Sequence, residues 1–208
     1  MAISAPSDEA RGIAVFDFDG TLIEGDSLWA FFAFAAGWPR VIAALVECGA
    51  YLAAGRLRNN ADPELADART YLKALLLLRL LAGRKTAELT PVLARLRGWL
   101  RWKDAIRQTL LEHHAKGHHI VIATGALDLY LPALLEGLPH DAVLCTHVGV
   151  ANGVIEGTMP DGNCVRERKA EMVAAYLAAH GPFGESWGYG NLPHDLPMLN
   201  LLKHQVIV

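Results

Sequence analysis

The sequence predicts an α/β protein: a mostly parallel β-sheet with helices on both faces, interrupted by an all-helical insertion. Two observations lead to this prediction. Short apolar segments alternate with helical ones from residue 104 onward, and such alternation implies right-handed crossovers between parallel strands. An apolar strand at residues 13–18 comes first, and residues 22–103 after it carry helical signals but no strand signal.

The insertion is predicted to form a cap of four or five helices. Its apolar stretches have helical length and are separated by glycine and proline breaks, which fall at residues 37–39, 55, 62–63, 83 and 90–91. We therefore expect two domains. Residues 1–21 together with 104–208 form the core, and residues 22–103 form the cap.

The elements after the insertion are expected in a regular order. Helices are predicted at residues 104–116, 127–136, 166–180 and 194–202, and strands at 119–123, 142–145, 186–189 and 205–208. Residues 147–158 alternate around Asn152 and Gly153, a dipeptide that suits a type I′ turn and predicts a β-hairpin. The chain ends on its last strand with nothing to cover it, which suggests that a short tail is missing.

The composition indicates a folded globular protein. Of the 208 residues, 52% are hydrophobic and 20% are charged, and the net charge of −3 gives no basic footprint for nucleic acid. The three cysteines are far apart and form no CxxC pair, which fits free thiols in a reducing cytosol. The N-terminus lacks the features of a signal peptide, so a cytoplasmic location is expected. Nothing in the sequence predicts the oligomeric state.

Two apolar segments, residues 41–54 and 74–82, are shorter than the roughly 20 residues that a membrane-spanning helix needs. Each also contains a charged residue, Glu47 or Arg79. We therefore predict buried core helices and no stable membrane insertion. The alternative is an exposed apolar surface that contacts lipid or a lipid-like substrate.

Polar residues mark the carboxyl ends of the expected strands. In open parallel α/β sheets, ligands bind at these ends, so the strand ends define a candidate site. The ends carry Asp17-Phe18-Asp19-Gly20-Thr21, Thr124-Gly125 and Gly190-Asn191.

With these segments the sequence resembles the haloacid dehalogenase (HAD) superfamily, and within it the phosphoserine-phosphatase-like branch. The family's strand followed by Asp-x-Asp-Gly-Thr matches residues 13–21, its strand ending in Ser or Thr matches Thr124, and its lysine is best matched by Lys169. Its Gly-Asp-x-x-x-Asp strand end is matched in part by residues 190–195. The resemblance covers residues 13 to about 199 and implies a three-layer Rossmann-like core, a helical cap and phosphatase chemistry.

The residues themselves fit that chemistry. A phosphate monoester dianion repels an attacking carboxylate, so a divalent cation such as Mg²⁺ must screen the repulsion. Asp17 is expected to attack phosphorus and form an aspartyl-phosphate, while Asp19 protonates the leaving alcohol and then activates water. Four groups are expected to hold or neutralise the phosphoryl oxygens: Thr124, Lys169 and the backbone N–H groups around Phe18 and Gly125.

The expected metal ligands are Asp17, the backbone carbonyl of Asp19, and Asn191 or Asp195. Asn191 is the main departure from the family, which usually has an acid there. An amide oxygen can bind Mg²⁺ but brings no charge. We therefore expect either weaker Mg²⁺ binding than is usual in the family or direct coordination of the metal by Asp195. The alternative to an enzyme is a catalytically impaired protein on the same fold that binds phosphate ligands or has a regulatory role. For Lys169, a solvated helix face is the competing interpretation.

The expected substrate is a small organic phosphate ester, selected by the cap. Glu24 or Asp26 would pair with a substrate ammonium, as in phosphoserine, phosphoethanolamine or histidinol phosphate; helix capping is the competing role for Asp26. A substrate carboxylate would be met by an arginine of the insertion: Arg56, Arg58 or Arg69. The apolar cap keeps a lipid phosphate open as an alternative substrate.

Overall fold

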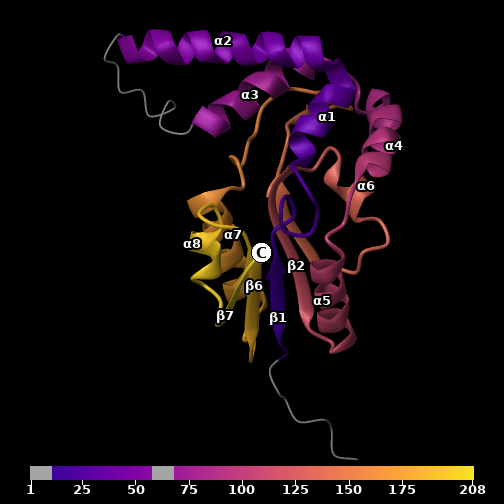
Figure 1. Cartoon of the computed structure of the whole chain (residues 1–208), viewed down its shortest axis with the longest axis vertical. Helices are drawn as coiled ribbons and strands as arrows, with labels where there is room; N and C mark the ends of the chain where they lie inside the picture. The colour runs from indigo at the N-terminus through magenta and orange to yellow at the C-terminus, as the bar shows by residue number, and fades with distance from the viewer. Residues whose placement is uncertain (1–10, 58–67) are drawn as a thin grey trace, which may run out of the picture.

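The computed structural model describes residues 11–57 and 68–208, and a parallel sheet of five strands forms the centre of this part (Figure 1). Their spatial order is β3-β2-β1-β6-β7. The strands are β1 (Ile13–Phe16), β2 (His119–Leu127), β3 (Ala142–Thr146), β6 (Ser186–Gly190) and β7 (His204–Ile207). The chain moves outward from β1 through β2 to β3 and then crosses to β6 on the other side. The carboxyl ends of β1 and β6 therefore flank a topological switch point, where such sheets bind ligands.

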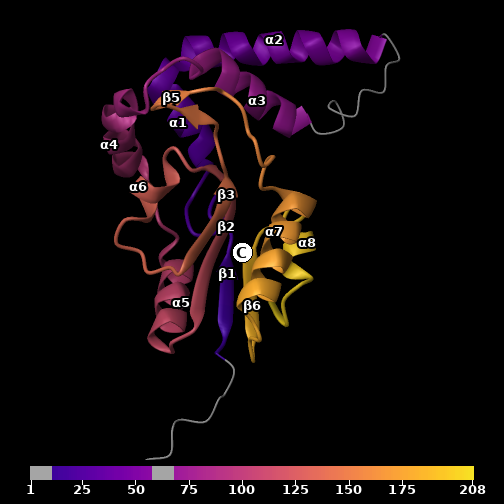
Figure 2. The ribbon, with the colours of Figure 1, turned by 180° about the vertical axis from the view of Figure 1, so that it is seen from behind.

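Side chains of β1 alternate between the two faces of the sheet, as the two-residue period of a strand requires. Ile13 and Val15 belong to one hydrophobic cluster, whereas Ala14 and Phe16 belong to the other. Helix α5 packs on one face and helices α7 and α8 on the other, so the predicted three layers are confirmed (Figures 1 and 2). The bounds of these helices are Asp104–Ala115 for α5, Arg166–His180 for α7 and Leu196–Leu199 for α8.

The insertion is helical throughout its described part and lies beyond the carboxyl ends of the strands (Figures 1 and 2). The connections into and out of it run side by side, because Ile23 forms an antiparallel bridge with Trp102. Its elements are α1 (Ser27–Ala36), α2 (Trp38–Leu57), α3 (Ala68–Leu80), the 3₁₀ helix η2 (Thr86–Leu89) and α4 (Thr90–Trp99).

Strand β2 runs past the end that the sequence predicts. It continues through Thr124 and Gly125 to Leu127, and its pairing with β3 shifts register between Ala123 and Leu127. The Thr124 hydroxyl accepts a hydrogen bond from the Ala126 N–H at 3.0 Å, which stabilises this irregularity. The predicted helix at residues 127–136 is consequently too long, and α6 occupies only Leu131–Leu135.

The predicted hairpin is confirmed. Strands β4 (Val150–Ala151) and β5 (Val154–Ile155) pair antiparallel across Asn152 and Gly153. Both turn residues have positive φ angles, 52° and 76°, as a type I′ turn requires.

Helix α2 is buried along one side only. Val41 and Cys48 face the core, whereas Trp38, Ile42 and Val46 are at least half exposed. The segment at residues 41–54 is helical as predicted, but the prediction that it is a buried core helix is wrong for its exposed side. Within residues 11–57 and 68–208, no single helix is long and apolar enough to cross a membrane, although α1 and the first part of α2, bent by 115°, pass that test together.

Candidate active site

Asp17 follows directly after β1, at the switch point of the sheet. Its backbone N–H donates to the Tyr189 carbonyl at 2.9 Å, which ties it to the end of β6. The side chain is buried, with 5% of the residue exposed. A hydrogen bond across two central strands therefore fixes the backbone that carries this carboxylate.

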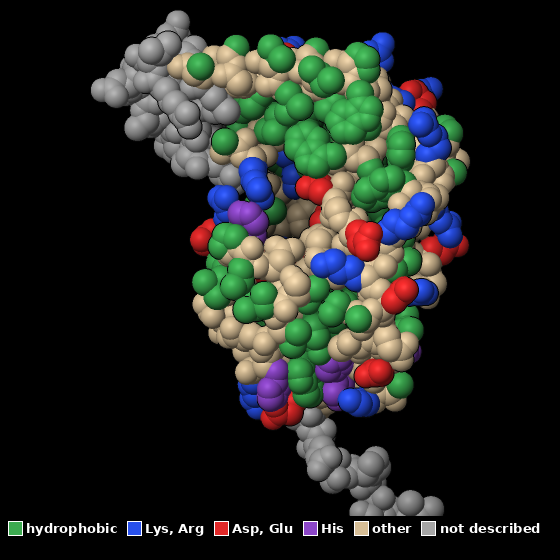
Figure 3. All heavy atoms as spheres, in the orientation of Figure 1, with side chains coloured by type: hydrophobic (Ala, Val, Ile, Leu, Met, Phe, Trp, Pro, Cys, Tyr) green, Lys and Arg blue, Asp and Glu red, His purple; other side chains and the backbone are tan. Residues whose placement is uncertain are grey.

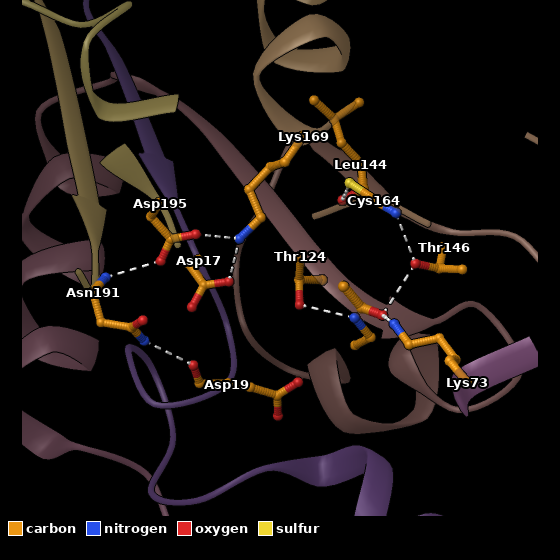
Figure 4. Close-up of polar contacts among 12 residues, drawn as sticks. Asp17, Asp19, Lys73, Thr124, Leu144, Thr146, Cys164, Lys169, Asn191 and Asp195 are labelled. Carbon is orange, nitrogen blue, oxygen red and sulfur yellow. Dashed lines mark hydrogen bonds and ion pairs between the residues drawn. The ribbon is translucent and has the colours of Figure 1, made fainter. Parts of the chain in front are cut away.

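Lys169 lies between two buried carboxylates (Figure 4). Its Nζ donates to Asp17 Oδ1 at 2.7 Å and to Asp195 Oδ1 at 2.6 Å. Burial alone would lower the pKa of Lys169, but the two carboxylates raise it, so the ammonium keeps its charge. Burial raises the pKa of Asp17, and Lys169 opposes that shift. In this structure, the lysine is part of the site and not of a solvated helix face.

Asp195 supports this arrangement from a second direction. Its other oxygen, Oδ2, accepts the Asn191 backbone N–H at 2.9 Å. Gly190 permits this close approach, because a Cβ there would lie 2.7 Å from the Asp195 Cβ. Both carboxylate oxygens are thus occupied within the protein, and Asp195 positions Lys169 and the loop after β6.

Asp19 is held differently from Asp17. Its Oδ1 accepts the Ser27 N–H at the start of α1 at 2.8 Å. Burial and the nearby charge of Asp26 raise the pKa of Asp19 to about 7. A carboxyl group with that pKa can donate a proton and later accept one near neutral pH. Asp17 and Asp195 thus share the Lys169 ammonium, whereas Asp19 accepts a backbone N–H.

Thr124, the third predicted catalytic residue, is fully buried and lines the same cavity as both aspartates. Gly125 lines it too, and its carbonyl accepts a hydrogen bond from Lys73 of α3 at 2.7 Å. Lys73 also donates to Asn163 Oδ1 at 2.6 Å, in a loop that precedes α7. The cap therefore reaches into the core at the residue after Thr124.

Lys73 and Asn163 were not predicted as site residues from the sequence. Lys73 precedes the leucine run of α3, between Arg69 and Arg79, and nothing in the sequence distinguishes it from these two cations. Asn163 carries no motif, yet it is buried and its Nδ2 donates to Thr70 Oγ1 of α3 at 2.8 Å. Its importance depends on a contact between segments that lie far apart in the sequence.

The predicted substrate-binding residues separate in the structure. Asp26 lines the cavity and also caps α1, because its Oδ1 accepts the Leu28 N–H at 3.0 Å. Glu24 is exposed and lies outside the residues that line the cavity. Phe18 is buried among core residues, edge-on to Trp102, and its carbonyl accepts the N–H groups of the following turn.

Of the three arginines considered for a substrate carboxylate, Arg69 lines the cavity and its guanidinium lies 3.1 Å from His194 Nε2. This contact joins α3 to the loop after β6, and both residues line the cavity. Arg58 and the side chain of Arg56 lie outside the described residues.

The oxygen atoms near Asp17 fit a hard cation. Within the described part of the chain, no three His, Cys, Asp or Glu side chains are grouped to hold a metal, so carbonyl and amide oxygens would be needed. The Asp19 carbonyl lies 3.3 Å from Asn191 Nδ2, and a half-turn of that amide would present its oxygen instead. Mg²⁺ prefers oxygen ligands and usually keeps several waters, so Asp17, the Asp19 carbonyl and Asn191 are a suitable set.

These residues surround one cavity of about 360 Å³ between the cap and the core. Figure 3 shows a hollow there, with acidic, basic and histidine side chains at its rim and hydrophobic side chains on the cap. The volume lies near the lower end of the range for small-molecule sites, roughly 300–1,000 Å³.

The histidines at residues 113–119 make local contacts away from this cavity. His113 is buried, with Nδ1 2.7 Å from His118 Nδ1 and Nε2 2.8 Å from the Tyr189 hydroxyl. Burial lowers the pKa of His113 to about 4. His119 Nε2 lies 2.6 Å from the Tyr176 hydroxyl. The packing of α5 against the sheet accounts for the position of His113, and the packing of α7 against β2 accounts for that of His119.

Comparison with known proteins agrees with this geometry. A family model described as haloacid dehalogenase-like hydrolase matches residues 14–200. Protein CicA of Caulobacter vibrioides is 29% identical over 194 residues, which cover 90% of this chain and 81% of CicA.

Two solved structures confirm the predicted fold. One, a protein of unknown function from Bordetella pertussis Tohama I, has a TM-score of 0.72 at 21% identity, over 95% of this chain and 90% of that one. The other, a probable phosphoserine phosphatase from Vibrio cholerae in unliganded form, has a TM-score of 0.64 at 17% identity, over 94% and 55% of the two chains.

Proposed function

The chain belongs to the haloacid dehalogenase-like hydrolases, and on this premise we propose that it is a magnesium-dependent phosphomonoester hydrolase working through an aspartyl-phosphate at Asp17. One observation carries the proposal: the two carboxyl groups that follow β1 are both buried but have different partners, the Lys169 ammonium for Asp17 and the Ser27 backbone N–H for Asp19. Asp17 is paired with Lys169, whereas burial raises the pKa of Asp19 to about 7. These different surroundings suit Asp17 to the role of nucleophile and Asp19 to the role of proton carrier.

We also propose the domain division expected from the sequence, with residues 22–103 as the cap and the remainder as the core. The paired connections at Ile23 and Trp102 lie near both proposed boundaries and support it. In this arrangement the cap closes over the nucleophile and restricts the leaving group.

In the first proposed step, an oxygen of Asp17 attacks phosphorus opposite the ester oxygen. The P–O bond to the alcohol breaks, and the alcohol oxygen takes the proton of Asp19 as it leaves. Thr124 and the Lys169 ammonium interact with the phosphoryl oxygens, whose charge spreads in the transition state. Mg²⁺ held by Asp17, the Asp19 carbonyl and Asn191 would screen the repulsion between the carboxylate and the phosphate dianion.

In the second step, the now ionised Asp19 removes a proton from water. The water oxygen attacks phosphorus, the bond between phosphorus and Asp17 breaks, and inorganic phosphate leaves. Asp19 regains its proton and the Asp17 carboxylate is restored, so the cycle closes.

The proposal is tested by phosphate release from a panel of phosphomonoesters, with and without Mg²⁺. Turnover that depends on the cation supports it. If well-folded protein releases no phosphate from any ester yet binds inorganic phosphate, the hydrolase proposal is wrong and a phosphate-binding protein is favoured.

Asn191→Asp is expected to lower the Mg²⁺ concentration that gives half-maximal activity by about tenfold. The substitution adds a charged oxygen ligand beside the Asp19 carbonyl, and carboxylates bind Mg²⁺ more strongly than neutral amides do. A magnesium titration of both proteins measures this shift. Asn200→Asp, at the end of α8, is the control for an added surface charge. An unchanged half-saturation point would contradict the assignment of Asn191 as a ligand.

Asp19→Asn is expected to uncouple the two steps when the substrate is 4-nitrophenyl phosphate. This leaving group needs little protonation, so Asp17 is still phosphorylated, but the phosphoenzyme lacks a base to activate water. Rapid mixing should show a burst of nitrophenol equal to the enzyme present, followed by turnover roughly 10²–10⁴-fold below the wild type. Slow release without a burst would mean that Asp19 does not act in the second step.

A further inference from the structure

The cavity has two chemically different ends. The strand ends supply its polar end, with Asp17, Asp19, Thr124 and Lys169. This is where the proposed function places the phosphoryl group, and the inference below rests on that proposal. The opposite end is lined by side chains that contact whatever alcohol the phosphate carries.

The rest of the lining combines polar and apolar side chains. Arg69 and Lys73 contact His194 and Asn163 there, Arg166 lines the cavity beside Val165, and the apolar side chains come from three segments. Helix α1 contributes Leu28 and Trp29, and helix α3 contributes Leu72 and Leu76. Val165, just before α7, adds an apolar side chain from the core. Leu28, Trp29, Leu72 and Val165 are each partly exposed, so they have surface left to cover. Covering this surface with an apolar group of the substrate would favour binding.

The cavity offers few groups that could bind a substrate ammonium. Among the described residues of the insertion, Asp26 is the one carboxylate that lines the cavity. Its Oδ1 already accepts the Leu28 N–H, as the cap of α1. Glu24, the other acid considered, lies outside the cavity lining. An amino alcohol would therefore lose its hydration against an apolar wall without a dedicated partner.

We infer that the preferred substrate is a phosphomonoester of a compact apolar alcohol, such as a benzyl or branched alkyl ester. The ester oxygen lies near Asp19, and the apolar group packs between α1 and α3 against Leu28, Trp29 and Leu72. The cavity of about 360 Å³ limits the size of this group. The expected substrate is thus an ester with an apolar leaving group, in place of the phosphoserine-like ester expected from the sequence.

The test compares benzyl phosphate with phosphoserine and phosphoethanolamine. All three release a primary alcohol, so differences in kcat/KM report recognition more than leaving-group reactivity. Benzyl phosphate is expected to be preferred by about tenfold or more, because a methylene-sized difference in an apolar pocket already changes specificity by roughly 10–200-fold.

Leu72→Ser is expected to lower kcat/KM for benzyl phosphate by about tenfold and to leave the two polar esters within about twofold, since only the apolar group contacts this residue. Leu78→Ser is the matched control, because Leu78 lies on the same helix, is 55% exposed and does not line the cavity. Trp29→Gln provides a second test on the other helix.

The outcomes separate the two proposals. The inference about the leaving group is wrong if turnover requires Asp17 but favours phosphoserine, and if Leu72→Ser and Trp29→Gln lose no activity toward benzyl phosphate. The proposed hydrolase function would still hold in that case. Absence of Asp17-dependent turnover with every ester overturns the proposed function itself.

Discussion

Asp17→Asn is expected to reduce phosphate release by roughly 10⁴-fold or more, because removing a nucleophile removes the covalent route itself. The amide has nearly the same shape as the carboxylate but cannot attack phosphorus. Lys169 retains Asp195 as a partner in the variant, so its ammonium is not left without a counter-charge. Steady-state phosphate release under saturating Mg²⁺ measures the effect.

Asp161→Asn is the control for this variant. Asp161 is exposed and pairs with His147 on the surface, so its loss should leave turnover unchanged. Unfolding midpoints of both variants show whether each is folded. Asp17→Asn protein that is folded and retains more than about a tenth of wild-type activity would show that Asp17 is not the nucleophile.

Lys169→Met is expected to affect both stability and activity. The ammonium lies between Asp17 and Asp195, and all three side chains are nearly inaccessible to solvent. Removing one partner of a buried ion pair leaves uncompensated charge and typically costs about 3–5 kcal/mol in the free energy of unfolding. Activity should fall as well, since the charge that faces the phosphoryl oxygens is lost.

Urea unfolding and phosphate release measure the two effects of Lys169→Met. Lys203→Met serves as the control, because Lys203 pairs with Glu185 where both side chains are about half exposed. Little change is expected there, since exposed pairs contribute little. A Lys169→Met protein as stable as the control variant would contradict the buried ion-pair arrangement.

Much of the site could be predicted from the sequence because the relevant residues follow parallel strands. Asp17 follows β1, Asn191 follows β6, and strands of one parallel sheet bring their carboxyl ends to a single edge. Thr124 and Lys169 were predicted from their order in the chain, and both line the cavity with Asp17.

The length of β2 could not be predicted in the same way. Thr124 and Gly125 have the composition of a turn, and local signals placed the strand end there. In the structure the strand continues, because the irregular pairing after Ala123 is stabilised by the Thr124 hydroxyl. A bulge of this kind depends on the neighbouring strand, which local sequence does not reveal.

The contribution of the cap to the cavity could not be predicted from the sequence either. Lys73 hydrogen-bonds to Gly125 and Asn163, which lie in segments distant from it in the chain. Glu24 and Asp26 were both candidates for a substrate ammonium, and only the path of the chain into α1 shows that Asp26 lines the cavity and Glu24 does not. Residue type and spacing predict which chemistry is available, whereas the packing of the cap decides which side chains reach the cavity.

The central claim is that phosphate is carried covalently by Asp17. It is tested most directly by quenching the protein during turnover of 4-nitrophenyl phosphate, reducing any acyl phosphate with borohydride, and mapping the modified peptide by mass spectrometry. The account predicts homoserine at position 17, with more of it in Asp19→Asn, where the second step is slow. Modification at another residue, or none during rapid turnover, would contradict it.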